Sequence, residues 1–328
     1  MVHLLTEELV RRGCQVTLFA AGASRTSGQL CRLHPEAVVE MMEGGAAFEY
    51  DHYANTNLVN ALARSDAFDV IHSHLGFQQL PLGRLARCGF VQTVHITPSM
   101  DDRWAMAQCD DVAIVSASRA QVAAVPAARR ASIRVIHHGI DFDAYAPGVE
   151  PGRTLVFLAR MSPQKSPIDA IRIAEQAGMA LVLAGAPQNA EEAAYFEAEV
   201  RPRIDGRRVR HVGRVDHQQK NELLREAAAL LFPIQGDEAF GLAMIEAMAC
   251  GTPVLAWDRA SVPEIVDHGT TGFVGNSVEE LAMFAGRAGG LDRAVVRAHA
   301  RSRFHFTRMV DEYQAVYRTL AGRDADAS

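Results

Sequence analysis

The stretch "EAFGLAMIEAMACGTPVLA" (residues 238–256) contains one complete helix pattern followed directly by the start of a strand. Phe240, Met244 and Met248 recur at helical spacing, which predicts a packed helix over about residues 241–250. Gly251 is a typical residue for ending that helix. Pro253 then opens the apolar strand "PVLAW", so this stretch shows the helix-to-strand step of an α/β protein.

The same alternation extends over the whole chain. In the first half, five apolar runs read as buried strands, at residues 15–22, 69–74, 89–95, 111–118 and 133–139. In the second half, similar runs lie at residues 154–161, 180–185, 208–215 and 229–234, with helix-length patterns between them. Continuous apolar strands are typical of a parallel sheet that is covered on both faces. The expected fold class is therefore α/β, with doubly wound sheets.

The alternation is interrupted once, at "DFDAYAPGVEPGR" (residues 141–153), which is rich in proline, glycine and acid and reads as a linker. We therefore expect an N-terminal domain over residues 1–145 and a C-terminal domain over residues 152–300. A last helix over residues 303–321 is expected to cross back to the first domain. Doubly wound sheets bind ligands at the carboxyl ends of their strands, so functional residues are sought there.

Composition excludes several classes of protein. The 328 residues carry a net charge of −6, so there is no basic excess for a nucleic-acid partner. No apolar run approaches the length of about 20 residues that a membrane-spanning helix needs. The five cysteines are scattered and form no CxxC pair, which favours reduced thiols in the cytoplasm.

Two carboxylates mark the opening stretch as a candidate binding site. Glu238 precedes the predicted helix, and Glu246 lies one to two turns into it. A carboxylate can accept two hydrogen bonds from the vicinal hydroxyls of a ribose, and the amides at residues 240–242, at the helix start, could hold a phosphate. Spacing alone leaves an alternative open, in which Glu246 is solvated and Glu238 is only favoured by the helix dipole.

Two cations earlier in the same domain favour the binding site. Arg160 and Lys165 follow a predicted strand, five residues apart in a strand-to-helix loop. An arginine fork and a lysine point charge suit a diphosphate, although surface exposure is the common fate of both residue types. Together with the acids they describe a nucleotide-diphosphate site. The chain has neither a Walker A sequence nor a GxGxxG fingerprint.

Three segments carry a resemblance to a known family. "FLARMSPQKS" (residues 157–166), the opening stretch and "VPEIVDHGTTGFV" (residues 262–274) resemble, in that order, the donor domain of a family 4 glycosyltransferase. This retaining family has the GT-B fold, in which two Rossmann-like, doubly wound domains face a cleft, and it uses nucleotide-diphosphate sugars. Its hallmark is a pair of glutamates separated by seven residues, matched here by Glu238 and Glu246.

The resemblance implies a role for each matching residue. Glu246 would bind the donor ribose, and Glu238 would lie beside the donor sugar at the reaction centre. Arg160 and Lys165 would bind the diphosphate. His95, at the strand end "QTVHITP", would contact the donor sugar or its phosphate, with a core histidine as the alternative. The remaining donor-binding candidates are the amides of Phe240, Gly241 and Leu242, and Val215 beside the base.

The implied activity is hexosyl transfer with retained configuration. The implied donor is a nucleotide-diphosphate sugar, most simply a UDP-sugar, and the acceptor is a small molecule, a glycan or a lipid. GT-B enzymes generally need no metal, so no cofactor is expected. Family members often act at membrane surfaces, so the implied location is the cytoplasm with a peripheral membrane contact.

Several features depart from the family pattern. The chain starts within what resembles the first helix of the N-terminal domain, and the first strand and glycine-rich loop that normally precede it are expected but not found. The N-terminal domain is thus expected to be incomplete. This keeps open a second hypothesis, a degenerate nucleotide-sugar-binding or scaffold protein without transferase activity.

Three further polar groups need an interpretation. His72 and His74 share a strand face and could suggest a metal, but no third ligand has matching spacing. His138 stands where the family more often has asparagine. Asp141 and Asp143, in "DFD", imitate the metal-binding acids of another glycosyltransferase fold, but they fall in the linker and read as a solvated loop.

Overall fold

The computed structural model describes residues 1–20, 22, 24–150 and 152–322, and their contacts divide into two units. The first unit comprises Met1–Gly139 and the chain from Phe306 onward, and the second comprises Ile140–His305. The boundary between the units lies between Gly139 and Ile140, just before the linker expected at residues 141–153. Phe142 and Tyr145 of that expected linker are buried and belong to the second unit. The final helix, α14 (Phe306–Leu320), belongs to the first unit.

The second unit is built on a six-stranded sheet in which every pair of neighbours is parallel. Its order is β12-β11-β10-β7-β8-β9. The strands are β7 (Thr154–Leu158), β8 (Ala180–Ala184), β9 (Val209–His211), β10 (Ala229–Phe232), β11 (Val254–Trp257) and β12 (Gly272–Gly275). All four residues of β10 and of β11 are buried, as expected for continuous apolar strands that are covered on both faces.

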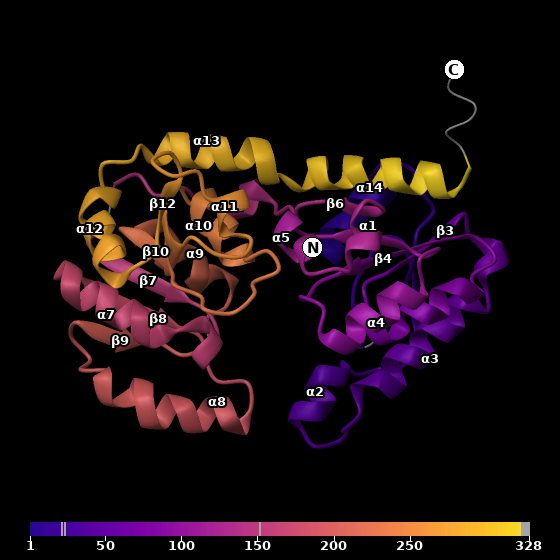
Figure 1. The fold of residues 1–328 in the computed structure, drawn as a ribbon, viewed down its shortest axis with the longest axis horizontal. Coiled ribbons are helices and arrows are strands. Elements are labelled where there is room, and N and C mark those ends of the chain that lie inside the picture. Colours follow the sequence, from indigo (N-terminus) through magenta and orange to yellow (C-terminus); the bar gives the residue numbers. More distant parts are fainter. Residues whose placement is uncertain (21, 23, 151, 323–328) are drawn as a thin grey trace. The chain divides into compact units, whose positions relative to one another are not determined.

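Helices cover both faces of this sheet. On one face α7 (Pro167–Ala177) packs against α12 (Val278–Ala288), and both contribute to the core with Leu155 and Phe157 of β7 (Figure 1). Elsewhere in the unit, α10 (Leu242–Ala249) packs against α9 (His217–Glu226) and α13 (Arg293–Phe304). The shorter helical segments are η3 (Phe142–Ala144), η4 (Pro163–Lys165), α8 (Ala190–Tyr195), η5 (Phe196–Val200), η6 (Arg201–Arg203) and α11 (Val262–Ile265).

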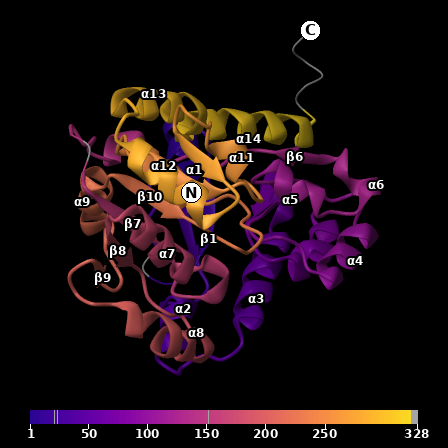
Figure 2. The same cartoon turned by 60° about the vertical axis from the view of Figure 1, so that its left-hand side comes forward.

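The strand order reverses between β7 and β10. From β7 the chain builds outward through β8 and β9, and it then returns to the other side of β7 for β10, β11 and β12. Figure 2 shows β10, β7, β8 and β9 in this sequence. The loops that leave the carboxyl ends of β7 and β10 diverge at such a switch point, where doubly wound sheets bind their ligands.

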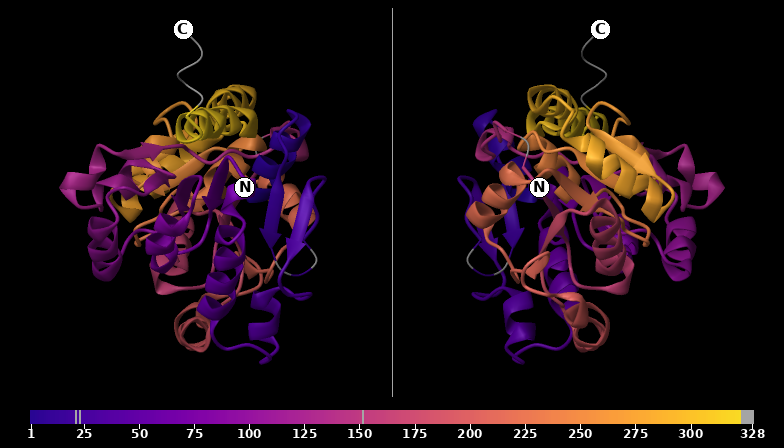
Figure 3. Two further views of the ribbon diagram at one scale, coloured as in Figure 1. Left: turned by 90° about the vertical axis from the view of Figure 1, so that its right-hand side faces the viewer. Right: turned by 90° about the vertical axis from the view of Figure 1, so that its left-hand side faces the viewer.

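The first unit contains two separate parallel sheets. One is the pair β1 (Thr17–Ala20) and β2 (Gln29–Arg32), and the other has the order β3-β4-β5-β6. The latter strands are β3 (Val70–Ser73), β4 (Gly89–Val94), β5 (Ala113–Ser116) and β6 (Ile133–Val135). Figure 3 shows β1 and β2, in indigo, set apart from the other strands of this unit.

Two apolar clusters cover the faces of the four-stranded sheet. On one face α1 (Val2–Arg11) and α14 pack over Val91 and Val115. On the other, α3 (Tyr50–Leu62), η2 (Phe77–Leu85) and α4 (Met100–Gln108) pack over Phe90 and Ile114. The remaining segments are α2 (Val38–Glu43), η1 (Ser65–Ala67), α5 (Arg119–Ala123) and α6 (Ala127–Arg130).

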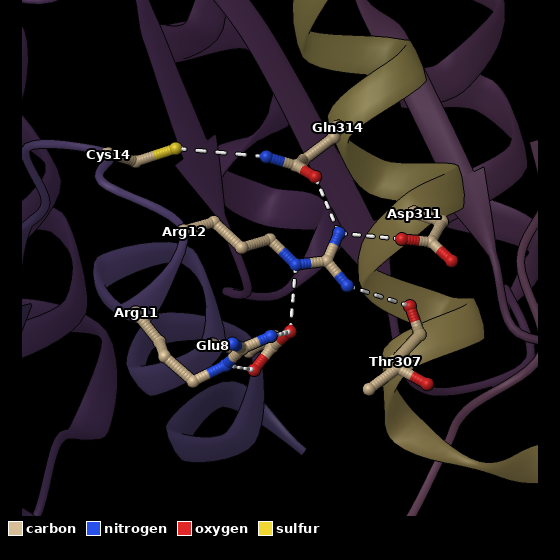
Figure 4. A network of polar contacts seen from close by, with 7 residues as sticks. All are labelled: Glu8, Arg11, Arg12, Cys14, Thr307, Asp311 and Gln314. Atoms are coloured by element: carbon tan, nitrogen blue, oxygen red, sulfur yellow. Dashed lines mark hydrogen bonds and ion pairs between the residues drawn. The ribbon is translucent and has the colours of Figure 1, made fainter.

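Arg12 ties α1 to α14 (Figure 4). Its guanidinium donates to Glu8 Oε1 at 2.8 Å, and to Asp311 Oδ1 and Gln314 Oε1 at 2.6 Å. Glu8 also pairs with Arg11, and these two arginines lower the pKa of the Glu8 carboxyl to about 2. The N-terminal helix is therefore fixed to the C-terminal helix by a charged network as well as by apolar contacts.

Two chemical expectations can be compared with this fold. All five cysteines are free thiols. Within the described part of the chain, no helix has both the length and the apolar character needed to cross a membrane.

Candidate functional site

Lys165 and Glu238 lie together at the switch point of the second unit. Lys165 ends η4 in the loop after β7, and Glu238 lies in the loop after the adjacent strand β10. The Lys165 Nζ atom forms an ion pair with Glu238 Oε2. The loops are also joined by their backbones, because Gln164 O accepts from Gln235 N at 2.9 Å and from Gly236 N at 3.2 Å. The structure thus unites two candidates that are 73 residues apart in the sequence.

Arg160 lies near the same edge of the sheet, two residues beyond β7. Its guanidinium forms an ion pair with Glu192 of α8, a residue whose side chain is only 8 % exposed. Glu192 Oε2 accepts a second hydrogen bond, from the Gln188 amide at 2.8 Å. Nothing in the sequence singles out Glu192, because an acid in the first turn of a helix is common. Its partner is visible only in the fold.

Glycines bring neighbouring loops close together at this edge. Gly185, after β8, has φ +131°, and a Cβ there would lie 1.9 Å from Ala159 O. Its amide donates to Gly213 O at 2.7 Å, which joins the loop after β8 to the loop after β9. Val215, the candidate for contact with the base, lies half-buried in that last loop, two residues beyond Gly213.

The start of α10 is shaped for a ligand that accepts hydrogen bonds. Gly241 is its N-cap with φ +85°, and no side chain caps the helix. Phe240 is buried, and Leu242 is 39 % exposed. Amides in the first turn of a helix have no carbonyl partner within the helix, so the positive end of α10 is available to an anion.

Glu246 lies on α10 in a network that the sequence did not predict. Its Oε1 atom accepts from Tyr145 Oη at 2.9 Å and from Lys220 Nζ of α9 at 2.5 Å. Burial, and then the nearby Glu246 carboxylate, raise the pKa of the Tyr145 hydroxyl, which therefore stays protonated and donates. Both hydrogen bonds go to Oε1, so the second oxygen of the carboxylate, Oε2, takes part in neither of them.

His95 belongs to a histidine cluster in the first unit. It follows β4, and its Nε2 atom lies 3.1 Å from Nδ1 of His74. Its ring centre is 5.4 Å from that of His138. Burial lowers the pKa of His74 and His95, and it lowers the pKa of His138 to about 3, so these imidazoles are neutral at pH 7.

His72 of β3 is half-buried, and both of its ring nitrogens are occupied. Nδ1 lies 2.7 Å from Tyr317 Oη, and Nε2 lies 2.7 Å from Thr93 Oγ1. Asp141 and Asp143 of the expected loop cluster with His305, and their ligand atoms lie within 4.8 Å of one another. Asp143 is already paired with Arg301 at 2.6 Å, which opposes the accumulation of negative charge that a cation site needs.

Comparison with known proteins covers both units. Residues 1–144 match the family model "Glycosyltransferase Family 4", and residues 146–285 match the model "Glycosyl transferases group 1". The chain belongs to the family 4 glycosyltransferases and has their GT-B fold, with two α/β units. The protein is accordingly an enzyme of glycosyl transfer, and the scaffold alternative is not favoured.

The individual relatives have low sequence identity to this chain. D-inositol 3-phosphate glycosyltransferases of Mycobacterium bovis and Mycobacterium tuberculosis are 26 % identical over 371 aligned residues, which cover 96 % of this chain and 77 % of the relative. Sucrose-phosphate synthase of Thermosynechococcus elongatus has a similar structure, with a TM-score of 0.76, 20 % identity and coverage of 98 % and 92 %. Anabaena HepE in complex with UDP and glucose gives a TM-score of 0.73, 18 % identity and coverage of 97 % and 95 %.

Proposed function

We propose that the protein transfers a hexose from a UDP-sugar to an acceptor hydroxyl with retention of the anomeric configuration. The observation that carries this proposal is the meeting of Lys165 and Glu238 at the switch point, beside the uncapped start of α10. A cation, an acid and the start of a helix at one strand edge suit a substrate with a diphosphate next to a sugar.

In this proposal two ion pairs of the site exchange partners when the donor binds. Arg160 and Lys165 turn from Glu192 and Glu238 to the diphosphate, which offers both cations charge-assisted hydrogen bonds. The amides of residues 240–242 take the phosphate oxygens at the α10 terminus. Glu246 accepts from the ribose hydroxyls, and Val215 borders the uracil.

The proposed reaction breaks the bond between the anomeric carbon and the leaving phosphate oxygen. The acceptor oxygen bonds to the same face of that carbon, and its proton passes to the leaving phosphate. Arg160, Lys165 and the α10 amides stabilise the negative charge that develops on the diphosphate. Glu238, released from Lys165, and the neutral His95 are assigned to the sugar. Because these groups supply the charge stabilisation, no metal is part of the proposal.

The acceptor remains one of three classes: a small molecule, a glycan or a lipid. The mycobacterial relatives are named for D-inositol 3-phosphate, so a phosphorylated polyol is the first acceptor to test. We propose a cytoplasmic location, with a peripheral membrane contact if the acceptor is a lipid.

A thermal-shift screen against UDP-, GDP- and ADP-sugars tests the donor. We expect stabilisation by uridine compounds, since any ligand of the folded state raises the melting temperature. Product analysis by NMR with the stabilising donor then tests retention, because the α or β anomer is read directly. A shift with guanosine or adenosine compounds alone would exclude the UDP assignment, and an inverted product would exclude retention.

A further inference from the structure

Tyr145 holds the carboxylate of Glu246 from a segment of irregular backbone. It lies between η3 and β7, it is only 6 % exposed, and its hydroxyl donates to Glu246 Oε1 at 2.9 Å. Its own amide makes a turn-type bond to Phe142 O at 3.3 Å. Because neither a helix nor a strand ladder fixes this backbone, the position of the Tyr145 hydroxyl depends on contacts from elsewhere in the unit.

Arg297 of α13 provides such contacts to the tyrosine backbone. Its Nη1 atom donates to Tyr145 O at 2.9 Å and also to Ala249 O, and its Nη2 atom donates to Phe142 O at 2.7 Å. Ala249 is the last residue of α10, the helix that carries Glu246. One planar guanidinium therefore ties the backbone of Tyr145 to the helix whose carboxylate the tyrosine holds.

Helix α9 supports the same segment on each side of Tyr145. Asn221 Nδ2 donates to Ala144 O at 3.1 Å, and Asn221 Oδ1 accepts from Ala146 N at 3.2 Å. His217 lies edge-on to the tyrosine ring, with ring centres 5.1 Å apart. The two α9 hydrogen bonds fix the residues beside Tyr145, whereas Arg297 binds the backbone of Tyr145 itself.

The geometry assigns Arg297 a positioning role: we propose that it sets the position of the Tyr145 hydroxyl and, through it, the orientation of the Glu246 carboxylate. The inference rests on the proposed ribose role of Glu246. With Oε1 held by the hydroxyl, the carboxylate presents Oε2 to the ribose in one orientation. Less conformational freedom is then lost when the donor binds, which strengthens binding.

A purely structural role for Arg297 predicts a different result. Its hydrogen bond to Ala249 O also caps the carboxyl end of α10. Loss of that cap is expected to lower the melting temperature whether or not Arg297 acts on the donor site. The affinity for the donor must therefore be measured separately from the stability of the fold.

A double-mutant cycle on UDP binding separates the two roles. Arg297→Lys keeps the charge but replaces the fork with a single ammonium, which cannot hold all three carbonyls. Tyr145→Phe removes only the hydroxyl. Because each change loses the net contribution of a hydrogen bond, we expect each to raise the Kd for UDP by about three- to tenfold in calorimetric titrations. The double variant should have the Kd of Tyr145→Phe alone, because Arg297 acts through that hydroxyl.

Arg293→Lys is the matched control on the same helix. Arg293 donates to Arg225 O at 2.8 Å and to Ala227 O at 2.9 Å, and in the described structure it makes no hydrogen bond to residues 142–145. We expect a lower melting temperature and an unchanged Kd for UDP. Arg297→Gln, which keeps a donor group without the charge, repeats the cycle if Arg297→Lys is unfolded at the temperature of the titration.

The inference is wrong if substitution of Arg297 leaves the Kd unchanged, or if it raises the Kd by the same factor when Tyr145 is already phenylalanine. An equal rise in Arg293→Lys would assign the effect to a general loosening of α13. If the unmutated protein does not bind UDP, the proposed function is overturned together with this inference. UDP binding with an additive cycle would overturn this inference alone.

Discussion

Glu246 is the residue on which the donor assignment depends most directly. Its Oε1 atom is held by Tyr145 and Lys220, and the proposal gives Oε2 to the ribose hydroxyls. Replacement of Glu246 by glutamine keeps the size of the side chain but removes the charged acceptor. A hydrogen bond to a charged group contributes about 1.5–3 kcal/mol, so we expect the Kd for UDP to rise by about 10- to 100-fold in calorimetric titrations.

Glu222→Gln is the matched control for that substitution. Glu222 is an exposed residue of α9 whose carboxylate accepts only from Gln218 in the described structure, at 3.0 Å. We expect its substitution to leave UDP binding unchanged. The ribose assignment fails if Glu246→Gln binds UDP as tightly as this control does.

Lys220 is expected to act through Glu246 rather than on the reacting sugar. It fixes one carboxylate oxygen and thereby orients the other. Lys220→Met keeps most of the side-chain length but releases the carboxylate. We expect the KM for the donor to rise by about three- to tenfold with kcat unchanged, because the loss affects the bound ground state and the transition state equally.

The readout for Lys220 separates positioning from a purely structural role. Lys220→Arg should restore most of the affinity, since it returns a cation to Glu246. A Lys220→Met enzyme with a lowered kcat and an unchanged KM would place the lysine on the reacting groups instead.

At the scale of the element, the start of α10 depends on Gly241. An alanine at φ +85° costs about 1–2 kcal/mol in the left-handed region. Its Cβ would also lie 2.6 Å from Met244 Cε and 2.9 Å from Phe232 Cζ. We expect Gly241→Ala to lower the free energy of unfolding, measured in urea, by about 2–3 kcal/mol.

Gly178→Ala isolates the backbone contribution. Gly178 ends α7 at φ +66°, but a Cβ there would meet nothing within 4 Å. Its substitution should cost only the backbone strain of about 1 kcal/mol. Equal losses at Gly178 and Gly241 would show that packing at the start of α10 is less strict than the distances indicate.

The helix of the opening stretch illustrates what could be predicted for an element. The apolar spacing of Phe240, Met244 and Met248 predicted a helix that the structure places at Leu242–Ala249, with all three side chains buried. Apolar residues at helical spacing mark the buried face of a helix, so their spacing was sufficient to predict this helix. It could not report that Tyr145 and Lys220 converge on Glu246, because that contact depends on how the chain between them folds.

At the scale of the whole molecule, the histidine cluster predicts a dependence of stability on pH. Burial lowers the pKa of four histidines in the first unit, to about 3 for His72 and His138. An unfolded histidine binds a proton below a pH of about 6.5, while folded His72 and His138 do so only near pH 3. Stability is therefore complete above a pH of about 6.5 and falls as the pH drops, by about 1.4 kcal/mol per pH unit for each of these two histidines.

Amide exchange in β4 at pH values from 5 to 7.5 measures this loss, after correction for the intrinsic exchange rate. His138→Asn is the control, since it removes one of the titrating groups and should reduce the slope by about one proton. A slope that is the same in both proteins, or stability that rises toward pH 5, would contradict the assignment of neutral buried histidines.

The division of the sheet in the first unit is also a property of the whole molecule. The apolar runs at residues 15–22 and 69–74 predicted two strands, which the structure confirms as β1 and β3. Only the fold showed a cavity between β1 and β3, because sequence order does not determine which strands are neighbours.

The sequence alone determined the α/β class, the family and the identity of the charged candidates, since these depend on local periodicity and on short motifs. The tertiary structure decided how those candidates pair. Lys165 meets Glu238 because β7 and β10 are neighbours in a sheet whose order reverses between them. Arg160 meets Glu192 because β7 and β8 are neighbours, and Lys220 meets Glu246 because α9 packs against α10. Electrostatic pairing depends on distance in space, and only the packed sheets set that distance.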